Sequence, residues 1–218
     1  MLNRLRSGAG RVVGPVARAL LARGVSPDAV TIAGTVGVVV AALWLLPTGR
    51  LLAGTLVIAL FALTDMIDGV MARTSGRTSP WGAFLDSTLD RFGDAAIFTG
   101  LLLHLVAVDE RPTAGFALAC LVLGSIVPYA RARAEGLGMR ADVGIAERAD
   151  RLALVLAATF AVGVGAPVVV LTVVLALLAV ASAVTVVQRM AVVRRQALAG
   201  VPPVPPAAPG APDAGAGA

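Results

Sequence analysis

Six stretches of apolar residues, each near the length of a membrane span, constrain the fold of this chain more than any other feature. About 20 residues of α-helix are needed to cross the hydrocarbon core of a bilayer. The stretches cover residues 29–47, 51–72, 82–106, 113–133, 149–166 and 168–190. Only 14% of the residues are charged, whereas a soluble domain has about 25%. The sequence therefore predicts an all-α integral membrane protein, with six transmembrane helices in one domain over residues 29–195.

The segments before and after the spans have different compositions. Residues 1–28 contain five arginines spread among apolar residues, without the unbroken apolar core of a signal peptide. They predict an amphipathic helix that lies in the membrane interface. Residues 199–218 are almost wholly Ala, Pro and Gly, and Asp213 is their only charge. Such a tail cannot bury a core and is expected to be disordered.

The distribution of arginine orients the helices. All 18 basic residues are Arg, and 15 of them lie in residues 1–28, in residues 73–81 and 131–151, and after residue 188. Because cytoplasmic loops are enriched in basic residues, both termini and these two connections are predicted to be cytoplasmic, in a multi-pass protein of the cell membrane. The same distribution accounts for the isoelectric point near 11.1, so we expect no nucleic-acid partner.

Four aspartates lie within 26 residues at the cytoplasmic ends of the second and third spans, where charged side chains are costly to insert. Asp65 and Asp68 are three residues apart, and Asp86 and Asp90 are four apart, so each pair shares one face of a helix. If these two helix faces lie opposite each other, they bring together four carboxylates. Such hard oxygen ligands suit Mg²⁺ or Mn²⁺. The one histidine, His104, lies in an apolar span, so a carboxylate is the expected general base.

The residues around these aspartates form the pattern D-x-x-D-G-x-x-A-R-x8-G-x-x-x-D-x-x-x-D between Asp65 and Asp90. This pattern resembles the signature of the CDP-alcohol phosphotransferase family, and every specified position is filled. The resemblance implies that the four aspartates hold a divalent metal centre beneath the diphosphate of CDP-diacylglycerol. It also implies that Asp90 is the catalytic base that deprotonates the attacking hydroxyl.

The resemblance further implies which residues bind CDP-diacylglycerol. Gly69 and Gly82 would let a bulky substrate approach the backbone, and Arg73 would offer a planar fork to a phosphate. Upstream, the segment SPDAVT over residues 26–31 resembles a short family element beside the nucleotide, although Asp28 replaces its usual Asn. Thr31 is carried over from that element, and capping of the first membrane helix is the competing interpretation. The implied binding residues are Thr31, Asp68, Gly69, Ala72, Arg73 and Gly82.

The connection over residues 131–151 is rich in arginine and resembles that of actinobacterial family members that use an inositol phosphate as acceptor. An acceptor with its own phosphate needs fixed cations, which an arginine-rich cytoplasmic cavity supplies. The candidates are Arg133, Arg148, Arg151 and Arg195. An ordinary positive-inside charge is the competing interpretation for each of them.

Asp94 continues the face of Asp86 and Asp90 by another four residues but lies outside the pattern. Its neighbour Arg91 offers an ion-pair partner. We therefore expect Asp94 to support the structure around the site.

The leading hypothesis is metal-dependent transfer of a phosphatidyl group from CDP-diacylglycerol to an inositol phosphate, which releases CMP. Glycerol 3-phosphate is the nearest alternative acceptor, because it would use the same metal site. A divalent-cation carrier is a remote alternative, since the last two spans contain almost no polar groups to continue a path. Small residues on those spans are compatible with a homodimer, which the resemblance also favours.

Overall fold

The computed structural model describes residues 13–76, 79–145 and 147–200, and every regular element in them is a helix. A helix over Val13–Ala22 comes first. The helices that follow are α2 (Pro27–Leu45), α3 (Leu51–Ala62), α4 (Thr64–Ser75), α5 (Pro80–Ala107), α6 (Arg111–Glu135), α7 (Arg148–Gly163) and α8 (Val169–Leu198). The predicted spans therefore correspond to helices, and the predicted all-α class is confirmed.

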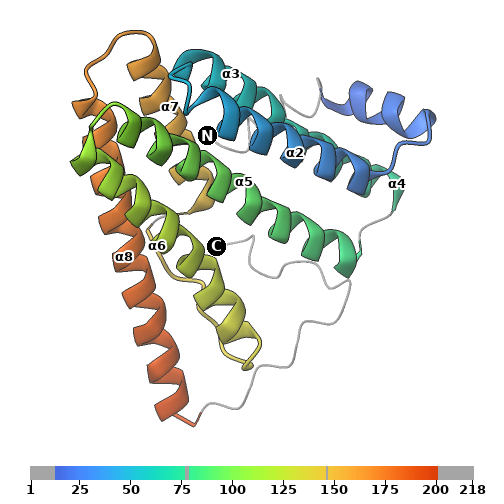
Figure 1. The fold of residues 1–218 in the computed structure, drawn as a ribbon. Helices are drawn as coiled ribbons and strands as arrows, with labels where there is room; N and C mark the ends of the chain where they lie inside the picture. Colours follow the sequence, from blue (N-terminus) through green and yellow to red (C-terminus); the bar gives the residue numbers. More distant parts are fainter. Residues whose placement is uncertain (1–12, 77–78, 146, 201–218) are drawn as a thin grey trace.

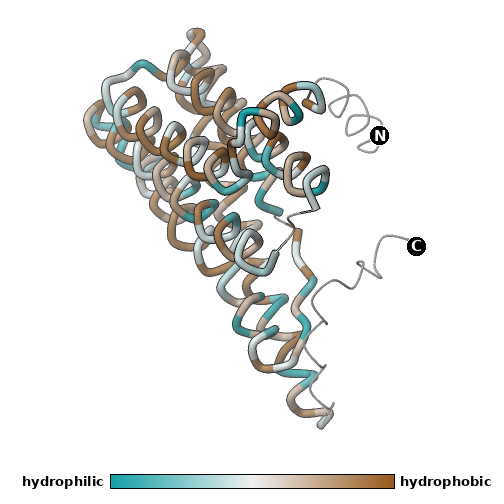
Figure 2. The backbone as a smooth tube through the Cα atoms, turned by 90° about the vertical axis from the view of Figure 1, so that its right-hand side faces the viewer, coloured by the Kyte–Doolittle hydropathy of each residue, from teal (hydrophilic) through white to brown (hydrophobic). Residues whose placement is uncertain are grey.

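Four helical segments are long and apolar enough to cross a membrane: Pro27–Leu45, Leu51–Ser75, Arg111–Glu135 and Val169–Leu198. Two predicted spans are not among them. The first half of α5 carries two acidic residues of the motif, Asp86 and Asp90, and α7 has only 16 residues. Figure 2 shows that hydrophobic residues dominate the helices, while hydrophilic turns occur at mid-height and at the lower end as well as in the upper turns. The membrane character is thus borne out, and the count of six spans stays a prediction.

Two helices that form the site begin at the same kind of signal, a serine followed by a proline. The Ser26 hydroxyl accepts a 3.2 Å hydrogen bond from the Ala29 amide at the start of α2. The Ser79 hydroxyl accepts one of 3.0 Å from the Gly82 amide at the start of α5. Such caps satisfy amides that have no partner inside the helix. The residue that caps α2 is therefore Ser26, whereas Thr31 lies inside the helix and its hydroxyl donates to the Pro27 carbonyl at 3.2 Å.

The predicted span over residues 51–72 is divided in the structure at Leu63, between α3 and α4. The Thr64 hydroxyl donates a 2.6 Å hydrogen bond to the Phe61 carbonyl, and the Met66 amide donates one of 3.2 Å to the Leu63 carbonyl. These i→i−3 bonds tighten the turn and interrupt the regular helix. Asp65 consequently lies in the first turn of α4, where the positive end of the helix dipole favours a carboxylate.

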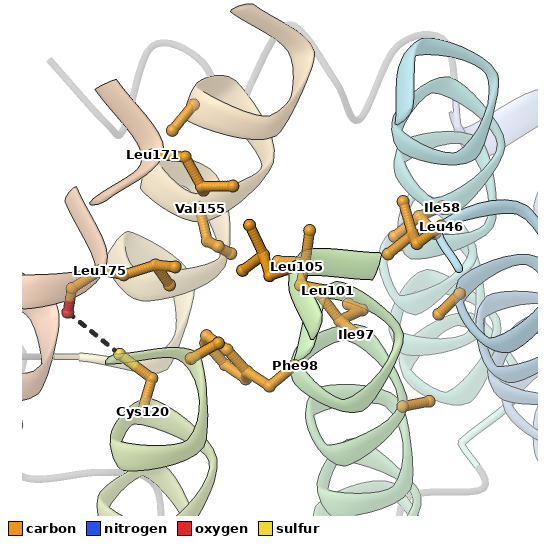
Figure 3. Close-up of a cluster of buried hydrophobic side chains, with 14 of the residues drawn as sticks. Leu46, Ile58, Ile97, Phe98, Leu101, Leu105, Cys120, Val155, Leu171 and Leu175 are labelled. Carbon is orange, nitrogen blue, oxygen red and sulfur yellow. Dashed lines mark hydrogen bonds between the residues drawn. The ribbon is translucent and has the colours of Figure 1, made fainter. Parts of the chain in front are cut away.

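Helix α2 packs against α3, α4 and α5, while α5 packs against α6, α6 against α8, and α7 against α3 and α8 (Figure 1). A core of fully buried side chains joins these helices, and its members include Leu46, Ile58, Leu101, Leu105, Val155, Leu171 and Leu175 (Figure 3). Cys120 is buried there, and its Sγ donates to the Leu175 carbonyl at 3.2 Å. Gly100 allows α5 to approach α2 closely, because a Cβ there would overlap the Ala42 carbonyl oxygen.

Two predicted segments extend outside the described residues. The helix Val13–Ala22 falls within the predicted amphipathic segment 1–28, whose first twelve residues are not described. The predicted tail over residues 199–218 is described only at its first two positions. Helix α8 continues to Leu198, eight residues beyond the predicted end of the last span.

Candidate active site

A cavity of about 400 Å³ lies where the first turns of α2 and α5 meet α4. Its walls contain all four aspartates of the motif and every residue that the resemblance assigns to CDP-diacylglycerol. It is lined by Pro27, Asp28, Thr31, Asp65, Asp68, Gly69, Ala72, Arg73, Ser79, Gly82, Ala83, Asp86, Asp90 and Arg148. The tertiary fold therefore brings together residues that the sequence places on three separate helices. We call this space the aspartate cavity.

The aspartates in the cavity have different neighbours. Asp68 is 7% exposed, and its Oδ2 accepts a 2.6 Å hydrogen bond from the Thr31 hydroxyl on α2. Asp90 Oδ1 lies 2.9 Å from Nη1 of Arg148, and Asp65 Oδ2 lies 3.9 Å from the same nitrogen. Asp86 is exposed in the cavity wall. The carboxylates are thus held from α2 and α7 as well as by their own helices.

Glycine and arginine share the α4 wall of the cavity. A Cβ placed on Gly69 would lie 3.4 Å from Nη1 of Arg73, so the guanidinium folds back over the glycine one turn earlier. A larger residue at position 69 would push this guanidinium aside. The exposed Arg73 therefore keeps a charged fork at the cavity wall, in the position expected for a contact with a phosphate.

The donor set of the aspartate cavity fits a divalent cation, because four carboxylates from two helices provide the hard oxygen ligands that Mg²⁺ and Mn²⁺ prefer. Across the described ranges, no three acidic, histidine or cysteine side chains stand close enough to hold a metal as they are oriented. Asp65 and Asp90 contact Arg148 instead, and Asp68 contacts Thr31. Ligation thus requires the carboxylates to turn from these partners toward an ion.

A second cavity of about 320 Å³ lies beside the first and is rich in arginine. It is lined by Arg91, Val127, Pro128, Arg131, Asp142, Val143, Gly144, Glu147, Arg148, Arg151 and Arg189. Arg148 lines both cavities and forms the wall that they share. We call the second space the arginine cavity.

Of the four arginines predicted for an acceptor, the structure brings Arg148 and Arg151 to the arginine cavity. Arg133 and Arg195 are exposed and do not line it. Arg133 lies about 200° round α6 from Arg131, and Arg195 lies about 120° round α8 from Arg189, given 3.6 residues per turn. Arg133 and Arg195 thus lie on other faces of α6 and α8 than the cavity-lining Arg131 and Arg189, and their role in binding an acceptor stays a prediction.

Three further arginines of the cavity were missed: Arg91, Arg131 and Arg189. Helical spacing offers a signal for Arg131, because Val127, Pro128 and Arg131 fall on one face of α6. Only the tertiary structure shows that Arg189 lines this cavity. Its Nε donates to the Val143 carbonyl at 2.9 Å and its Nη1 to the Val127 carbonyl at 2.5 Å, which ties α8 to the 136–147 connection and to α6.

Arg151 is unusual among these residues because it is only 4% exposed. Its Nη2 lies 3.6 Å from Oδ2 of Asp94. Its Nε and Nη1 atoms are buried and have no hydrogen-bond partner among the described residues. A buried guanidinium with unused donors is costly. The cavity is also lined by five arginines and only two carboxylates, and this excess of positive charge favours an anion there.

Comparison with known proteins agrees with this geometry. A family model for CDP-alcohol phosphatidyltransferase matches residues 24–177. The phosphatidylinositol phosphate synthase of Cutibacterium acnes is 49% identical over 203 residues, covering 89% of this chain and 98% of that protein. The phosphatidylinositol phosphate synthase of Streptomyces avermitilis is 47% identical over 204 residues, covering 90% of this chain and 84% of that protein.

Solved structures of a Mycobacterium tuberculosis phosphatidylinositol phosphate synthase share the fold at 44% sequence identity. The crystal structure with CDP-DAG bound has a TM-score of 0.80 and covers 84% of this chain and 94% of that one. The crystal structure in complex with manganese and citrate has a TM-score of 0.79 and covers 84% of this chain and 88% of that one. The similarity extends over most of the helices that line the two cavities.

Proposed function

The chain belongs to the CDP-alcohol phosphatidyltransferase family, and we propose that it transfers the phosphatidyl group of CDP-diacylglycerol to a hydroxyl of an inositol phosphate. The acceptor oxygen forms a new bond to the β-phosphorus of the donor, the one that carries the diacylglycerol. The bond from that phosphorus to CMP breaks, and the products are CMP and phosphatidylinositol phosphate. The observation that carries this proposal is the pair of adjoining cavities, one lined by aspartates and the other by arginines, which share Arg148 as a wall.

The aspartate cavity is the donor site in this proposal. Asp65, Asp68, Asp86 and Asp90 would hold Mg²⁺ or Mn²⁺, and the bound metal neutralises the diphosphate and stabilises the departing CMP. The relative from Mycobacterium tuberculosis crystallises with manganese and, separately, with CDP-DAG, which supports both assignments. Arg73 binds a donor phosphate from the α4 wall, while Gly69, Ala72 and Gly82 leave room for the substrate.

Asp90 is the general base of the proposed reaction. Its carboxylate lies 2.9 Å from Arg148, the residue common to both cavities, and therefore borders the region where donor and acceptor meet. A carboxylate there accepts the proton of the acceptor hydroxyl as the oxygen attacks phosphorus. His104 cannot take this role, because it lies near Gly49 between α2 and α3, where an added Cβ would be 3.7 Å from its Cε1, and it lines neither cavity.

The arginine cavity is the acceptor site. Arg151 has buried donors without partners in the described part of the chain. Arg148 and Arg189 line the same cavity. Guanidinium groups bind phosphate through paired, charge-assisted hydrogen bonds. A phosphorylated acceptor is therefore favoured over an uncharged polyol. Arg133 and Arg195 are left out of this site because their exposed positions lie on other helix faces.

The proposal includes the arrangement of the protein in the cell membrane. All six predicted spans cross the bilayer, and both termini and the two cavities face the cytoplasm. The Val13–Ala22 helix lies in the interface. Two copies associate through small residues of the last spans. Gly163 is not available for that contact, because a Cβ there would lie 2.6 Å from the Leu52 amide of α3 in the same chain.

The experiment that tests the function offers three acceptors to the purified enzyme with CDP-diacylglycerol and Mg²⁺ or Mn²⁺. Inositol phosphate, free inositol and glycerol 3-phosphate are compared by separating the lipid products and measuring CMP release. We expect rapid formation of phosphatidylinositol phosphate and a much slower reaction with free inositol. Preference for glycerol 3-phosphate would overturn the acceptor assignment and leave the phosphatidyl transfer intact.

A further inference from the structure

We propose that Asp94 is a positioning residue, which holds the arginines at the boundary of the two cavities in the orientation that binds the acceptor phosphate. This inference rests on the proposed function and concerns the same site. Asp94 lies outside the aspartate pattern, on α5 one turn after Asp90. It is 8% exposed and lines neither of the two cavities, so it acts through other side chains.

The Asp94 carboxylate contacts the guanidinium groups of three arginines. Asp94 Oδ1 accepts a 3.0 Å hydrogen bond from Nε of Arg148. Its Oδ2 lies 3.6 Å from Nη2 of Arg151 and 4.0 Å from Nη2 of Arg91. All three arginines line the arginine cavity. Asp94 is therefore the carboxylate around which that side of the cavity is assembled.

The contacts to Arg148 fix the plane of its guanidinium. Asp94 holds Nε, and Asp90 contacts Nη1 at 2.9 Å. Because the guanidinium is rigid and planar, two partners at different nitrogens determine where its remaining N–H groups point. An arginine side chain that is not held in this way has many rotamers, and ordering them would reduce the affinity for a ligand.

Arg151 is held at one nitrogen only. The contact of its Nη2 with Asp94 anchors the group, while its Nε and Nη1 have no partner in the described part of the chain. Three like charges crowded at one place repel each other, and the buried carboxylate between them counters this repulsion. Without that carboxylate, Arg91, Arg148 and Arg151 would be expected to move apart and lose their common orientation.

A positioning role and a purely electrostatic role for Asp94 predict effects of opposite sign. The arginine cavity is lined by five arginines and by the carboxylates of Asp142 and Glu147. If only net charge mattered, removing another carboxylate would strengthen the binding of a phosphate. If Asp94 positions the arginines, removing its charge weakens that binding. The sign of the change therefore decides between the two roles.

The test measures initial rates of the full-length enzyme and of Asp94→Asn over a range of inositol phosphate concentrations at saturating CDP-diacylglycerol, and then with the two substrates exchanged. We expect the KM for inositol phosphate to rise about tenfold, the effect of losing one charge-assisted contact. The KM for CDP-diacylglycerol should change less than about twofold, because Asp94 does not line the aspartate cavity. An unchanged or lower KM for inositol phosphate would overturn the proposal.

Asp150→Asn is the matched control. Asp150 lies in the first turn of α7, is exposed, and lines neither the aspartate cavity nor the arginine cavity. Its neutralisation removes the same charge near Arg148 and Arg151 and should leave the KM for inositol phosphate unchanged. If both substitutions raise this KM equally, Asp94 has no special role and the inference is wrong.

A second variant keeps the test decisive if Asp94→Asn reduces folding. Asp94→Glu retains the charge but displaces the carboxylate by one methylene, so it should raise the KM for inositol phosphate while the protein keeps its thermal unfolding midpoint. A normal KM in a folded Asp94→Glu enzyme would contradict a positioning role. Failure of the proposed function is seen separately, as an altered acceptor preference of the wild-type enzyme. The variants would then be assayed with the phosphorylated acceptor that the wild type prefers.

Discussion

The Thr31 hydroxyl on α2 donates a 2.6 Å hydrogen bond to Oδ2 of Asp68 on α4, and both side chains are only 7% exposed. This bond ties the helix that begins at the mouth of the aspartate cavity to one of the carboxylates proposed to hold the metal. The sequence resemblance assigned Thr31 to the nucleotide. Its described contact is with an aspartate, which indicates an additional role in orienting a ligand of the metal.

Thr31→Val should reduce kcat by about tenfold, because the isosteric valine removes a hydrogen bond to a buried carboxylate. The concentration of Mn²⁺ needed for half-maximal activity should also rise. Thr31→Ser retains the hydroxyl and should remain close to wild type. The measurement is a titration of activity with Mn²⁺ for the three enzymes. If Thr31→Val and the wild-type enzyme need the same Mn²⁺ concentration for half-maximal activity, Thr31 does not orient a ligand of the metal.

Asp65→Asn and Asp86→Asn should each abolish turnover and weaken the binding of Mg²⁺ or Mn²⁺, because each removes an anionic oxygen ligand. Activity of the wild-type enzyme should disappear in excess chelator and return when Mn²⁺ is added. Metal binding can be measured by calorimetry with the purified protein. Full activity in excess chelator would show that the reaction needs no metal.

Asp90→Asn should still bind CDP-diacylglycerol, yet lose several orders of magnitude in turnover, because an amide cannot accept the proton of the acceptor hydroxyl. Arg148, whose Nη1 lies 2.9 Å from the carboxylate, offers only hydrogen-bond donors and cannot replace the base. Binding of the donor and single-turnover release of CMP are measured in parallel. Near-normal turnover would remove Asp90 from the role of base.

Arg151→Gln should raise the KM for inositol phosphate tenfold to a hundredfold, because a lost charge-assisted contact costs roughly 1.5–3 kcal/mol. The KM for CDP-diacylglycerol should be nearly unchanged. Arg133→Gln is the control, since Arg133 has the same charge but is exposed outside the arginine cavity. A larger effect at Arg133 than at Arg151 would contradict the helix faces that the structure assigns to the acceptor site.

Gly100→Ala should destabilise the protein by about 1–3 kcal/mol, because its Cβ would overlap the Ala42 carbonyl oxygen and force α5 away from α2. Gly115→Ala is the matched control in α6, where a Cβ would have no atom within 4 Å. Thermal unfolding in detergent should show a lower midpoint for the first variant only. Equal midpoints would mean that the two helices can separate at no cost.

The sequence was sufficient to predict the helical class, most helix positions and the composition of the aspartate cavity. Apolar stretches of about 20 residues predict membrane helices because the hydrocarbon core of a bilayer has a nearly fixed thickness. Asp65, Asp68, Asp86 and Asp90 could be grouped because spacings of three and four place side chains on one face of a helix, whatever the helix packs against. All of them, with Thr31 and Arg73, line one cavity.

Which arginines line the arginine cavity depends on tertiary structure. Arginine is frequent in every segment predicted to be cytoplasmic, so its abundance does not distinguish a phosphate site from positive-inside charge. Packing of α8 against α6 and the 136–147 connection brings Arg189 to the arginine cavity and leaves Arg195 exposed. In the same way, Arg148 lies between the cavities only because α7 carries it to within 3.0 Å of Asp94 on α5, a contact between residues 54 positions apart in the chain. Local spacing determines which residues share a helix face, but the neighbour that each face meets depends on how the helices pack.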